Sequence, residues 1–263
     1  MINESGRIIS NLKIASNIWR LDIQLPQIVA KRPHPGQFVE LLIDRSFAKP
    51  LRRPMSIAGY TADVLSIIYK TFGEATRILT TKIAGDFIDV IGPLGNYFEL
   101  IEDDYSTPVL IAGGVGIPPI LWLHQELNRQ KQKHFLIIGA RTKAEHFITP
   151  DNENTLLTTD DGSLGIKGTV IPVLKKIISN VVGTRIFACG PEPMLKSIQK
   201  IALATKQPAQ LSIESHMACG VGLCQGCVIK RRNYQETEHS YQVKYVLVCS
   251  DGPVFKAGEI DFD

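Results

Sequence analysis

The chain has 263 residues, enough for about two domains, and its 44% apolar and 21% charged residues argue against disorder. The net charge of +3 is too small to favour nucleic acid as a partner. No apolar run approaches the roughly 18 residues of a membrane span, and the N-terminus lacks the pattern of a signal peptide. We therefore expect a cytoplasmic protein with no membrane or nucleic-acid partner, in which the five cysteines stay reduced.

Residues 1–101 are predicted to form a small antiparallel β-barrel. Short stretches there are alternating or mostly apolar, and glycines separate them, as in closed sheets of short strands. The expected strands cover residues 18–23, 37–43, 64–70 and 87–91. One short helix is expected over 74–81. The run Gly-Pro-Leu-Gly-Asn at 92–96 predicts a tight turn that closes the barrel.

Residues 102–212 alternate between strand and helix patterns, which predicts βαβ units around a parallel sheet. The expected strands cover residues 108–112, 135–139, 155–158, 185–188 and 210–214. Helical patterns follow residue 116, follow Thr169 and cover 192–204. Such an α/β unit is a common framework for binding nucleotides.

The glycine-rich turn 113–116 follows a predicted strand and opens a helix, so a phosphate could approach the backbone there. Gly114 and Gly116 are therefore candidate nucleotide contacts. The turn departs from the G-x-G-x-x-G fingerprint because a proline replaces the third glycine. Arg141 stands where an acidic residue would meet the ribose, and it could contact a 2′-phosphate or simply be exposed, which leaves NAD and NADP open. Residues 160–162, Asp-Asp-Gly, lie at a predicted strand end on the same side, where they either bind the nucleotide or cap a turn, and the turn is the preferred interpretation.

Four of the five cysteines lie in the last 45 residues, as Cys219-x4-Cys224-x2-Cys227 followed by Cys249. Three thiolates so close together need a loop that wraps a small object, and the interspersed glycines permit one. The spacing is that of plant-type [2Fe–2S] clusters. Structural zinc and unligated cysteines are the alternatives, although zinc sites usually present two separated pairs. Residues 213–263 are thus predicted to form a small cluster-binding lobe, with a hairpin over 228–248 before the last ligand.

Three further features have a plain interpretation beside a functional one. Residues 52–56 place two guanidinium groups beside a hydroxyl, which suits a pyrophosphate and a flavin ring nitrogen, but a solvated basic turn would look the same. The basic triplet 230–232 is interpreted as a solvated hairpin tip. Cys189 ends a predicted buried strand, where a lone cysteine usually serves as a small apolar filler.

The motifs occur in a recognisable order. Arg53-Pro54-Met55-Ser56, the runs 92–95 and 113–116, and Cys189-Gly190-Pro191 together make the chain resemble the ferredoxin–NADP reductase superfamily. With the cysteine motif 217–227 and the run 249–255, it closely resembles the electron-transfer subunits of type B, NAD-linked dihydroorotate dehydrogenases. The resemblance covers essentially the whole chain. It implies a flavin-binding barrel, a nucleotide-binding parallel-sheet domain and a [2Fe–2S] lobe.

The resemblance also implies site residues. FAD contacts are implied for Arg53, Pro54, Met55, Ser56, Ile68, Tyr69, Lys70, Ala75 and Thr76. Cluster ligands are implied at Cys219, Cys224, Cys227 and Cys249. Ser56 is expected near the flavin N5, and Ala75 stands where many relatives have glycine. Cys189 is expected either beside the nicotinamide of NAD, together with Gly114 and Gly116, or in the core.

The function implied by the resemblance is electron transfer. An FMN-containing catalytic partner subunit would oxidise dihydroorotate, and this chain would carry the electrons through [2Fe–2S] and FAD to NAD⁺, in pyrimidine biosynthesis. The expected assembly is a heterotetramer with two copies of each subunit. One alternative is a flavin and iron–sulfur reductase subunit for another partner, such as an NAD(P)H–ferredoxin oxidoreductase or a hydrogenase. Another is a zinc-stabilised, non-catalytic interaction module.

Overall fold

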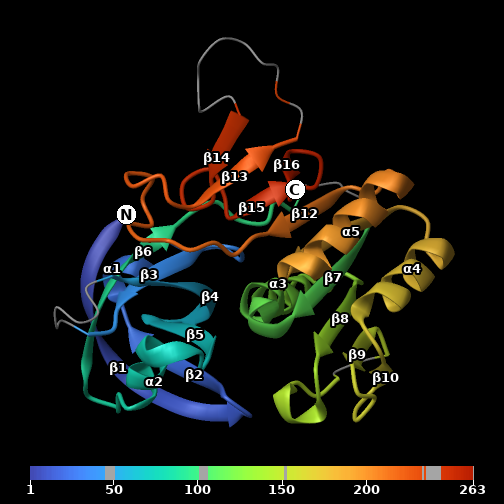
Figure 1. Cartoon of the computed structure of the whole chain (residues 1–263). Helices are drawn as coiled ribbons and strands as arrows, with labels where there is room; N and C mark the ends of the chain where they lie inside the picture. Colours follow the sequence, from blue (N-terminus) through green and yellow to red (C-terminus); the bar gives the residue numbers. More distant parts are fainter. Residues whose placement is uncertain (45–50, 101–105, 151–152, 233, 235–243, 263) are drawn as a thin grey trace.

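The computed structural model describes residues 1–44, 51–100, 106–150, 153–232, 234 and 244–262. A closed barrel, a larger twisted sheet with helices on both faces, and a small C-terminal sheet lie against one another (Figure 1). The fold class predicted from the sequence is confirmed. In the described part of the chain, no helix is long and apolar enough to cross a membrane.

The barrel has six strands in the order β1-β2-β5-β4-β3-β6, and every neighbouring pair is antiparallel. The strands are β1 Ile2–Ala15, β2 Ile18–Gln24, β3 Phe38–Leu42, β4 Arg53–Thr61, β5 Val64–Lys70 and β6 Phe87–Leu94. Two short helices, α1 Pro26–Val29 and α2 Gly73–Thr80, connect them. Aliphatic side chains such as Leu21, Leu41 and Ile67 fill the interior and are fully buried. The expected short helix over 74–81 corresponds to α2.

The predicted turn at 92–96 is wrong in its first half, because β6 continues to Leu94. Gly92 pairs with Ile2 of β1, and Leu94 pairs with Phe38 of β3. A Cβ atom on Gly92 would lie 2.6 Å from Val39 Cγ1, so the glycine there allows two strands to pack closely. Only Gly95, with φ of 73°, has the left-handed backbone that a turn requires.

The second sheet has the strand order β10-β9-β8-β7-β11-β12-β15. Its strands are β7 Thr107–Gly113, β8 Phe135–Ala140, β9 Thr155–Thr159, β10 Ile166–Lys167, β11 Thr184–Cys189, β12 Ala209–Ser212 and β15 Val254–Lys256. All pairs are parallel except β12 with β15, so the predicted parallel sheet carries one antiparallel edge strand from the C-terminal region. The strand predicted over 210–214 ends at Ser212.

Three helices cover this sheet. Helix α3 (Ile117–Arg129) packs on the face that presents Leu110 and Ala112, and it lies between the sheet and the barrel (Figure 1). Helices α4 (Val170–Asn180) and α5 (Glu192–Thr205) pack on the other face. Trp122 of α3 reaches the barrel core, which fixes the barrel against the sheet.

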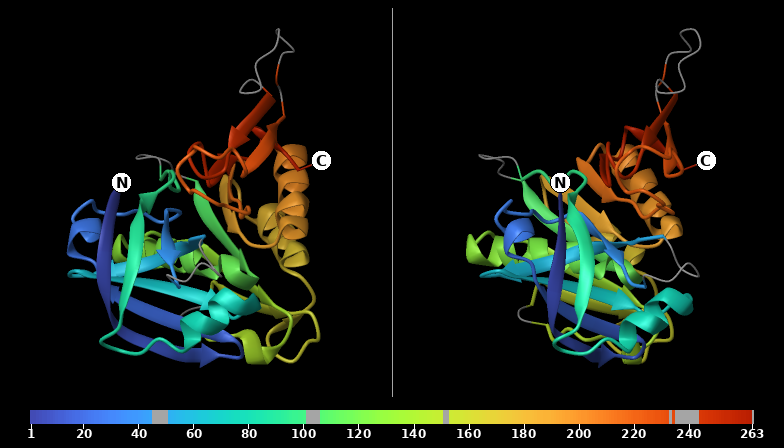
Figure 2. Two further views of the ribbon diagram at one scale, coloured as in Figure 1. Left: turned by 60° about the vertical axis from the view of Figure 1, so that its left-hand side comes forward. Right: turned by 90° about the vertical axis from the view of Figure 1, so that its left-hand side faces the viewer.

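The C-terminal region forms a three-stranded sheet from β13 Val228–Arg231, β14 Tyr245–Leu247 and β16 Ile260–Asp261. Its buried side chains, including Cys227 and Cys249, share a core with Phe38 and Leu94 of the barrel and with α5. Figure 2 shows this region above both larger bodies. The proposed domain boundaries remain a prediction, and the one between residues 101 and 102 lies outside the described residues.

The basic triplet 230–232 differs from the expected hairpin tip. Lys230 and Arg231 belong to strand β13, and Lys230 Nζ lies 3.6 Å from Asp261 Oδ2. The backbone N–H of Arg232 donates to Glu259 O. The triplet is therefore part of the small sheet, and most of the hairpin between the strands lies outside the described residues.

Candidate functional site

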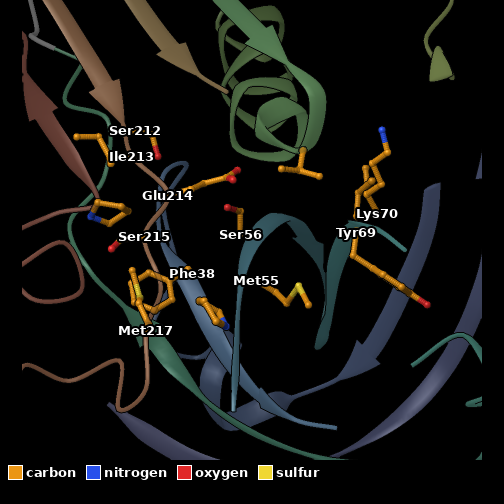
Figure 3. Close-up of a pocket in the computed structure, with 14 residues that line it drawn as sticks. Phe38, Met55, Ser56, Tyr69, Lys70, Ser212, Ile213, Glu214, Ser215 and Met217 are labelled. Atoms are coloured by element: carbon orange, nitrogen blue, oxygen red, sulfur yellow. The ribbon is translucent and has the colours of Figure 1, made fainter. Parts of the chain in front are cut away.

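A cavity lies where the barrel, the second sheet and the C-terminal region meet (Figure 3). Six of the nine predicted FAD contacts line it: Pro54, Met55, Ser56, Ile68, Tyr69 and Lys70. The facing wall comes from Val115, from the segment that follows β12 and from the C-terminal region: Ser212, Ile213, Glu214, Ser215, Met217 and Pro253. We call this cavity the flavin pocket. The structure thus brings together segments that are distant in the sequence.

The Ser56 hydroxyl and the Glu214 carboxyl group point toward each other across the flavin pocket (Figure 3). Burial raises the pKa of Glu214 above its usual range. Sequence reasoning missed Glu214 because it was assigned to the end of a strand. Unless the end of that strand is known, nothing about a lone glutamate five residues before a cysteine indicates that it lines a pocket.

Tyr69 contributes its ring edge to the flavin pocket and directs its hydroxyl away from it (Figure 3). The hydroxyl donates to Asn11 Oδ1 at 3.0 Å, and burial raises the pKa of Tyr69 to about 12. Tyr69 is therefore a neutral structural donor inside the barrel wall. Its role at the pocket is one of shape.

The two adjacent arginines have different environments. Arg52 forms an ion pair with Asp89 and also donates to Glu40 O. Glu40 is paired with Pro54 in the sheet, and because proline has no N–H, it cannot donate to this oxygen itself. Arg53 donates only to the backbone oxygens of Leu51 and Arg52, at 2.8 and 3.1 Å, and makes no ion pair within the described residues. Arg53 thus retains donors for an anionic ligand, whereas Arg52 serves the barrel.

The N-terminus of α2 carries the last two predicted FAD contacts, and neither lines the flavin pocket. The Ala75 methyl group packs against the barrel core. The Thr76 hydroxyl accepts from Phe72 N–H at 2.7 Å and donates to Phe72 O at 2.8 Å, so it closes the start of its own helix. Any contact with a phosphate at this helix would come from its free backbone N–H groups.

A second cavity, the nucleotide groove, lies at the carboxyl ends of the parallel strands. Gly114, Gly139, Arg141 and Asp160 line it together with the start of α5. Thr158 also lines it, and its hydroxyl is buried without a hydrogen-bond partner. Residues 160–162 form the expected turn, in which Asp161 accepts from Ser163.

Gly114 and Gly116 differ in what they contact. Gly114 lines the groove with a φ of 57°, a backbone conformation that suits glycine. Gly116 packs against the turn after β11, and a Cβ atom there would lie 2.3 Å from the backbone carbon of Cys189. Gly116 is therefore needed for packing beneath the groove.

We expect Gly116→Ala to lower the free energy of unfolding by roughly 1–3 kcal/mol or more, because backbone atoms must move to accept the methyl group. Gly258→Ala is the matched control, since no atom lies within 4 Å of its added carbon and its backbone is not left-handed. Thermal unfolding of both variants checks this. An equal or larger loss of stability in the Gly258 variant would show that the packing of Gly116 is not limiting.

Cys189 is buried in the core that packs under α3, and its thiol does not line either cavity. Burial raises its pKa well above the usual value, so the thiol stays neutral. These observations favour the core interpretation of Cys189.

Backbone N–H groups are directed at the sulfurs of three of the four C-terminal cysteines: Cys219, Cys227 and Cys249. Val221 and Cys224 donate to Cys219 Sγ, Gly222 to Cys249 Sγ, and Cys249 to Cys227 Sγ, at 3.2 to 3.5 Å. Burial opposes ionisation of Cys219, but these N–H groups outweigh it and lower its pKa to about 7. Such N–H groups stabilise thiolates and the sulfurs of an iron–sulfur cluster.

The four sulfurs fall into two pairs. Cys219 interacts with Cys224, and Cys249 interacts with Cys227 and, to a smaller extent, with Cys219. Burial of Cys249, together with the nearby Cys227, raises the pKa of Cys249 to about 12. Among the described residues, no three His, Cys, Asp or Glu side chains converge as they would on a single metal ion. Cysteine thiolates are the usual ligands of iron–sulfur clusters.

Glu40 of β3 is fully buried beneath the cysteine loop, and neither carboxyl oxygen has a hydrogen-bond partner. A Cβ atom on Gly220 would lie 2.6 Å from Glu40 Oε1, so the loop rests directly on this side chain. Burial, and to a smaller extent the nearby Cys219, raises the pKa of Glu40 to about 7.

Replacing Glu40 with methionine should stabilise the holoprotein by on the order of 1–3 kcal/mol at pH 8, because an unpartnered buried polar group is removed. Since the folded-state pKa is raised, stability from the protonated carboxyl is complete below about pH 4.5 and is lost as pH rises through about 7. The gain in melting temperature should therefore be larger at pH 8 than at pH 5. Parallel profiles for the two proteins would contradict this account.

The barrel, the groove at the sheet edge and the cysteine lobe together define a reductase of the ferredoxin–NADP reductase type that carries an iron–sulfur binding lobe. Residues 214–261 match the family described as the iron-sulfur cluster binding domain of dihydroorotate dehydrogenase B. The chain is 37% identical over 260 residues to the dihydroorotate dehydrogenase B (NAD(+)) electron transfer subunit of Caldanaerobacter subterraneus subsp. tengcongensis, with 98% of each chain covered. The chain belongs to this family of electron transfer subunits.

Two further relatives agree with this assignment. The corresponding subunit of Fusobacterium nucleatum is 33% identical, with 99% of each chain covered. Among solved structures, a chain of the NADH-dependent reduced ferredoxin-NADP oxidoreductase, described in work on flavin-based electron bifurcation, is similar with a TM-score of 0.82 and 30% identity. That match covers 98% of this chain and 90% of the other.

Proposed function

We propose that this chain carries electrons from dihydroorotate, oxidised by an FMN-containing partner subunit, to NAD⁺ by way of a [2Fe–2S] cluster and FAD. When bound, the cluster supplies one-electron and the flavin two-electron redox chemistry. The chain's own contribution is to hold both groups at fixed positions, in surroundings that tune them.

The observation that carries the proposal is that residues next to the cluster ligands in the sequence also form part of the wall of the flavin pocket. Met217 and Pro253 line the flavin pocket, and they flank the cluster ligands Cys219 and Cys249 in the sequence. On its other side the pocket continues past Lys70 and Val115 toward the nucleotide groove. The cluster site, the flavin pocket and the groove therefore follow one another in space, in the order that the proposed electron transfer requires.

The described residues fit both cofactors. Ser56 and the β5 residues 68–70 would hold the flavin ring, while Arg53 and the start of α2 would hold phosphates. The four cysteines, with N–H groups directed at three of their sulfurs, would hold the cluster. Gly114 and Thr158 would contact the nucleotide.

The partner would approach the cysteine loop. Cys224 is exposed, and the adjacent Leu223 side chain is 82% exposed. The partner would come close to the cluster on this side because one of the proposed ligands is exposed here. We further propose a cytoplasmic heterotetramer with two copies of each subunit, on the basis of family membership.

Purification with its catalytic partner tests the proposal. The complex should contain about one FAD and two irons per copy of this chain and should reduce NAD⁺ with dihydroorotate. A complex with this cofactor content that reduces ferredoxin with NADH but leaves dihydroorotate untouched would favour the second candidate, an NAD(P)H–ferredoxin oxidoreductase subunit. The 30% identity to a chain of such an enzyme supports this second candidate.

A further inference from the structure

Three charged side chains meet where the flavin pocket approaches the nucleotide groove. Glu145 Oε1 accepts from Lys70 Nζ at 2.9 Å and from Arg141 Nη2 at 2.6 Å and Nε at 3.1 Å. Lys70 belongs to barrel strand β5, whereas Glu145 and Arg141 follow β8 of the sheet. One carboxylate oxygen thus joins two cations from the two bodies.

This bridge lies at a small cavity between the flavin pocket and the nucleotide groove. Lys70 lines the flavin pocket, the groove and a third cavity between them, and Glu145 lines the last two. The cavity volumes are about 220 Å³ in the flavin pocket and about 540 Å³ in the groove, but only about 10 Å³ in the third cavity. The small cavity between them therefore has room for about one water molecule, so the flavin pocket and the groove are joined only through a narrow passage in this structure.

The bridge is anchored and permanently charged. The backbone N–H of Ser16 in the barrel donates to Ala144 O, next to Glu145. Burial alone would raise the pKa of Glu145, but hydrogen bonds from Arg141 and Lys70 outweigh it and hold the pKa below 4.5. The carboxylate therefore neutralises one of the two cations at neutral pH.

An anion held between a lysine and an arginine at the carboxyl edge of a parallel sheet mimics a phosphate. We propose that Glu145 occupies the anion site of the groove, and that the pyrophosphate of a dinucleotide displaces it from Lys70 and Arg141 and so opens the passage to the flavin. The inference rests on the proposed use of NAD. Glu145 is then an internal competitor of the nucleotide. Lys70 would pair with Glu145 before the nucleotide binds and with the pyrophosphate afterwards.

The test measures NADH affinity from the concentration dependence of flavin reduction in the holoenzyme complex. Glu145→Gln should tighten NADH binding by roughly three- to tenfold, because its charge no longer competes. The gain should shrink as salt rises, since the competing charges are partly exposed. Arg141→Gln should weaken binding, and the gain from Glu145→Gln should be smaller in the Arg141→Gln background.

Glu126→Gln is the matched control, because Glu126 pairs with Arg129 on the exposed side of α3, away from both cavities. Its NADH affinity should equal that of the wild type. Unchanged or weaker NADH binding by Glu145→Gln, in a complex with normal flavin content, would overturn this inference and leave the proposed function intact. Failure of NADH to reduce the flavin in any of these proteins, including the wild type, would overturn the proposed function and the inference with it.

Discussion

Replacing Cys224 with serine should remove the iron–sulfur centre and stop NAD⁺ reduction by dihydroorotate. Loss of one of four thiolate ligands should lower this activity by about two orders of magnitude or more, beyond the 10–100-fold cost of losing an outer-shell partner. Cys224 is the ligand of choice for this test because it is exposed, whereas Cys227 and Cys249 are buried in the shared core. Iron content and the visible absorption spectrum report the cluster directly.

The controls separate loss of the cluster from loss of the fold. The Cys224 variant should keep its FAD and should still oxidise NADH with an artificial acceptor such as ferricyanide, because the flavin pocket and groove are unaltered. Cys189→Ser should keep both irons, since Cys189 lies in the core under α3. Iron loss in the Cys189 variant, or undiminished dihydroorotate-linked activity in an iron-free Cys224 variant, would show that the ligand assignment or the electron path is wrong.

Replacing Arg53 with glutamine should release FAD. The Arg53 guanidinium group makes no ion pair within the described residues, and Arg53 precedes Pro54, which lines the flavin pocket. A charge-assisted hydrogen bond to a phosphate contributes about 1.5–3 kcal/mol, so the FAD dissociation constant should rise roughly 10- to 100-fold. Titration of the apoprotein with FAD measures this.

Arg52→Gln is the neighbouring control. Arg52 is held by Asp89 and by the backbone oxygens of Glu40 and Asp89, so its loss should lower the melting temperature and leave FAD affinity within about twofold. If the two variants lost FAD to the same extent, the guanidinium group of Arg53 would have no special role. In that event residues 52–56 would be a basic turn without a role in FAD binding, which is the alternative interpretation of their composition.

Local patterns predicted much of the fold and of the site. The cysteine spacing identified all four thiols that gather in the C-terminal lobe, because three of them lie within one loop. The motif around Ser56 and the strand 64–70 identified six of the fourteen residues that line the flavin pocket, since neighbouring residues of a strand lie close together. The glycine turn located the groove.

Other features depend on contacts between distant segments, which no local pattern reveals. Strand β1 escaped prediction because Glu4, a polar residue, occupies an inward position and accepts from Gln27 and Ile28 N–H at the start of α1. The early half of the expected turn at 92–96 is a strand because Gly92 must pack on Val39. Glu145 gains its role only from Lys70, which lies 75 residues earlier.

The structure also explains why the cysteine lobe belongs with the rest of the chain. Its apolar side chains complete a core that the barrel and α5 begin, and strand β15 closes the edge of the large sheet. The cluster site is thereby fixed relative to the flavin pocket. Electron transfer between two groups requires such a fixed separation more than it requires any reactive side chain.

The central claim is that electrons from dihydroorotate leave this chain on NAD⁺. The most direct test is the stoichiometry of NADH formed to dihydroorotate consumed by the purified complex, without any artificial acceptor. We predict one NADH for each dihydroorotate, and loss of NADH formation when this chain carries Cys224→Ser. Dihydroorotate consumption with no NADH produced, in a complex with full iron and flavin content, would contradict the account.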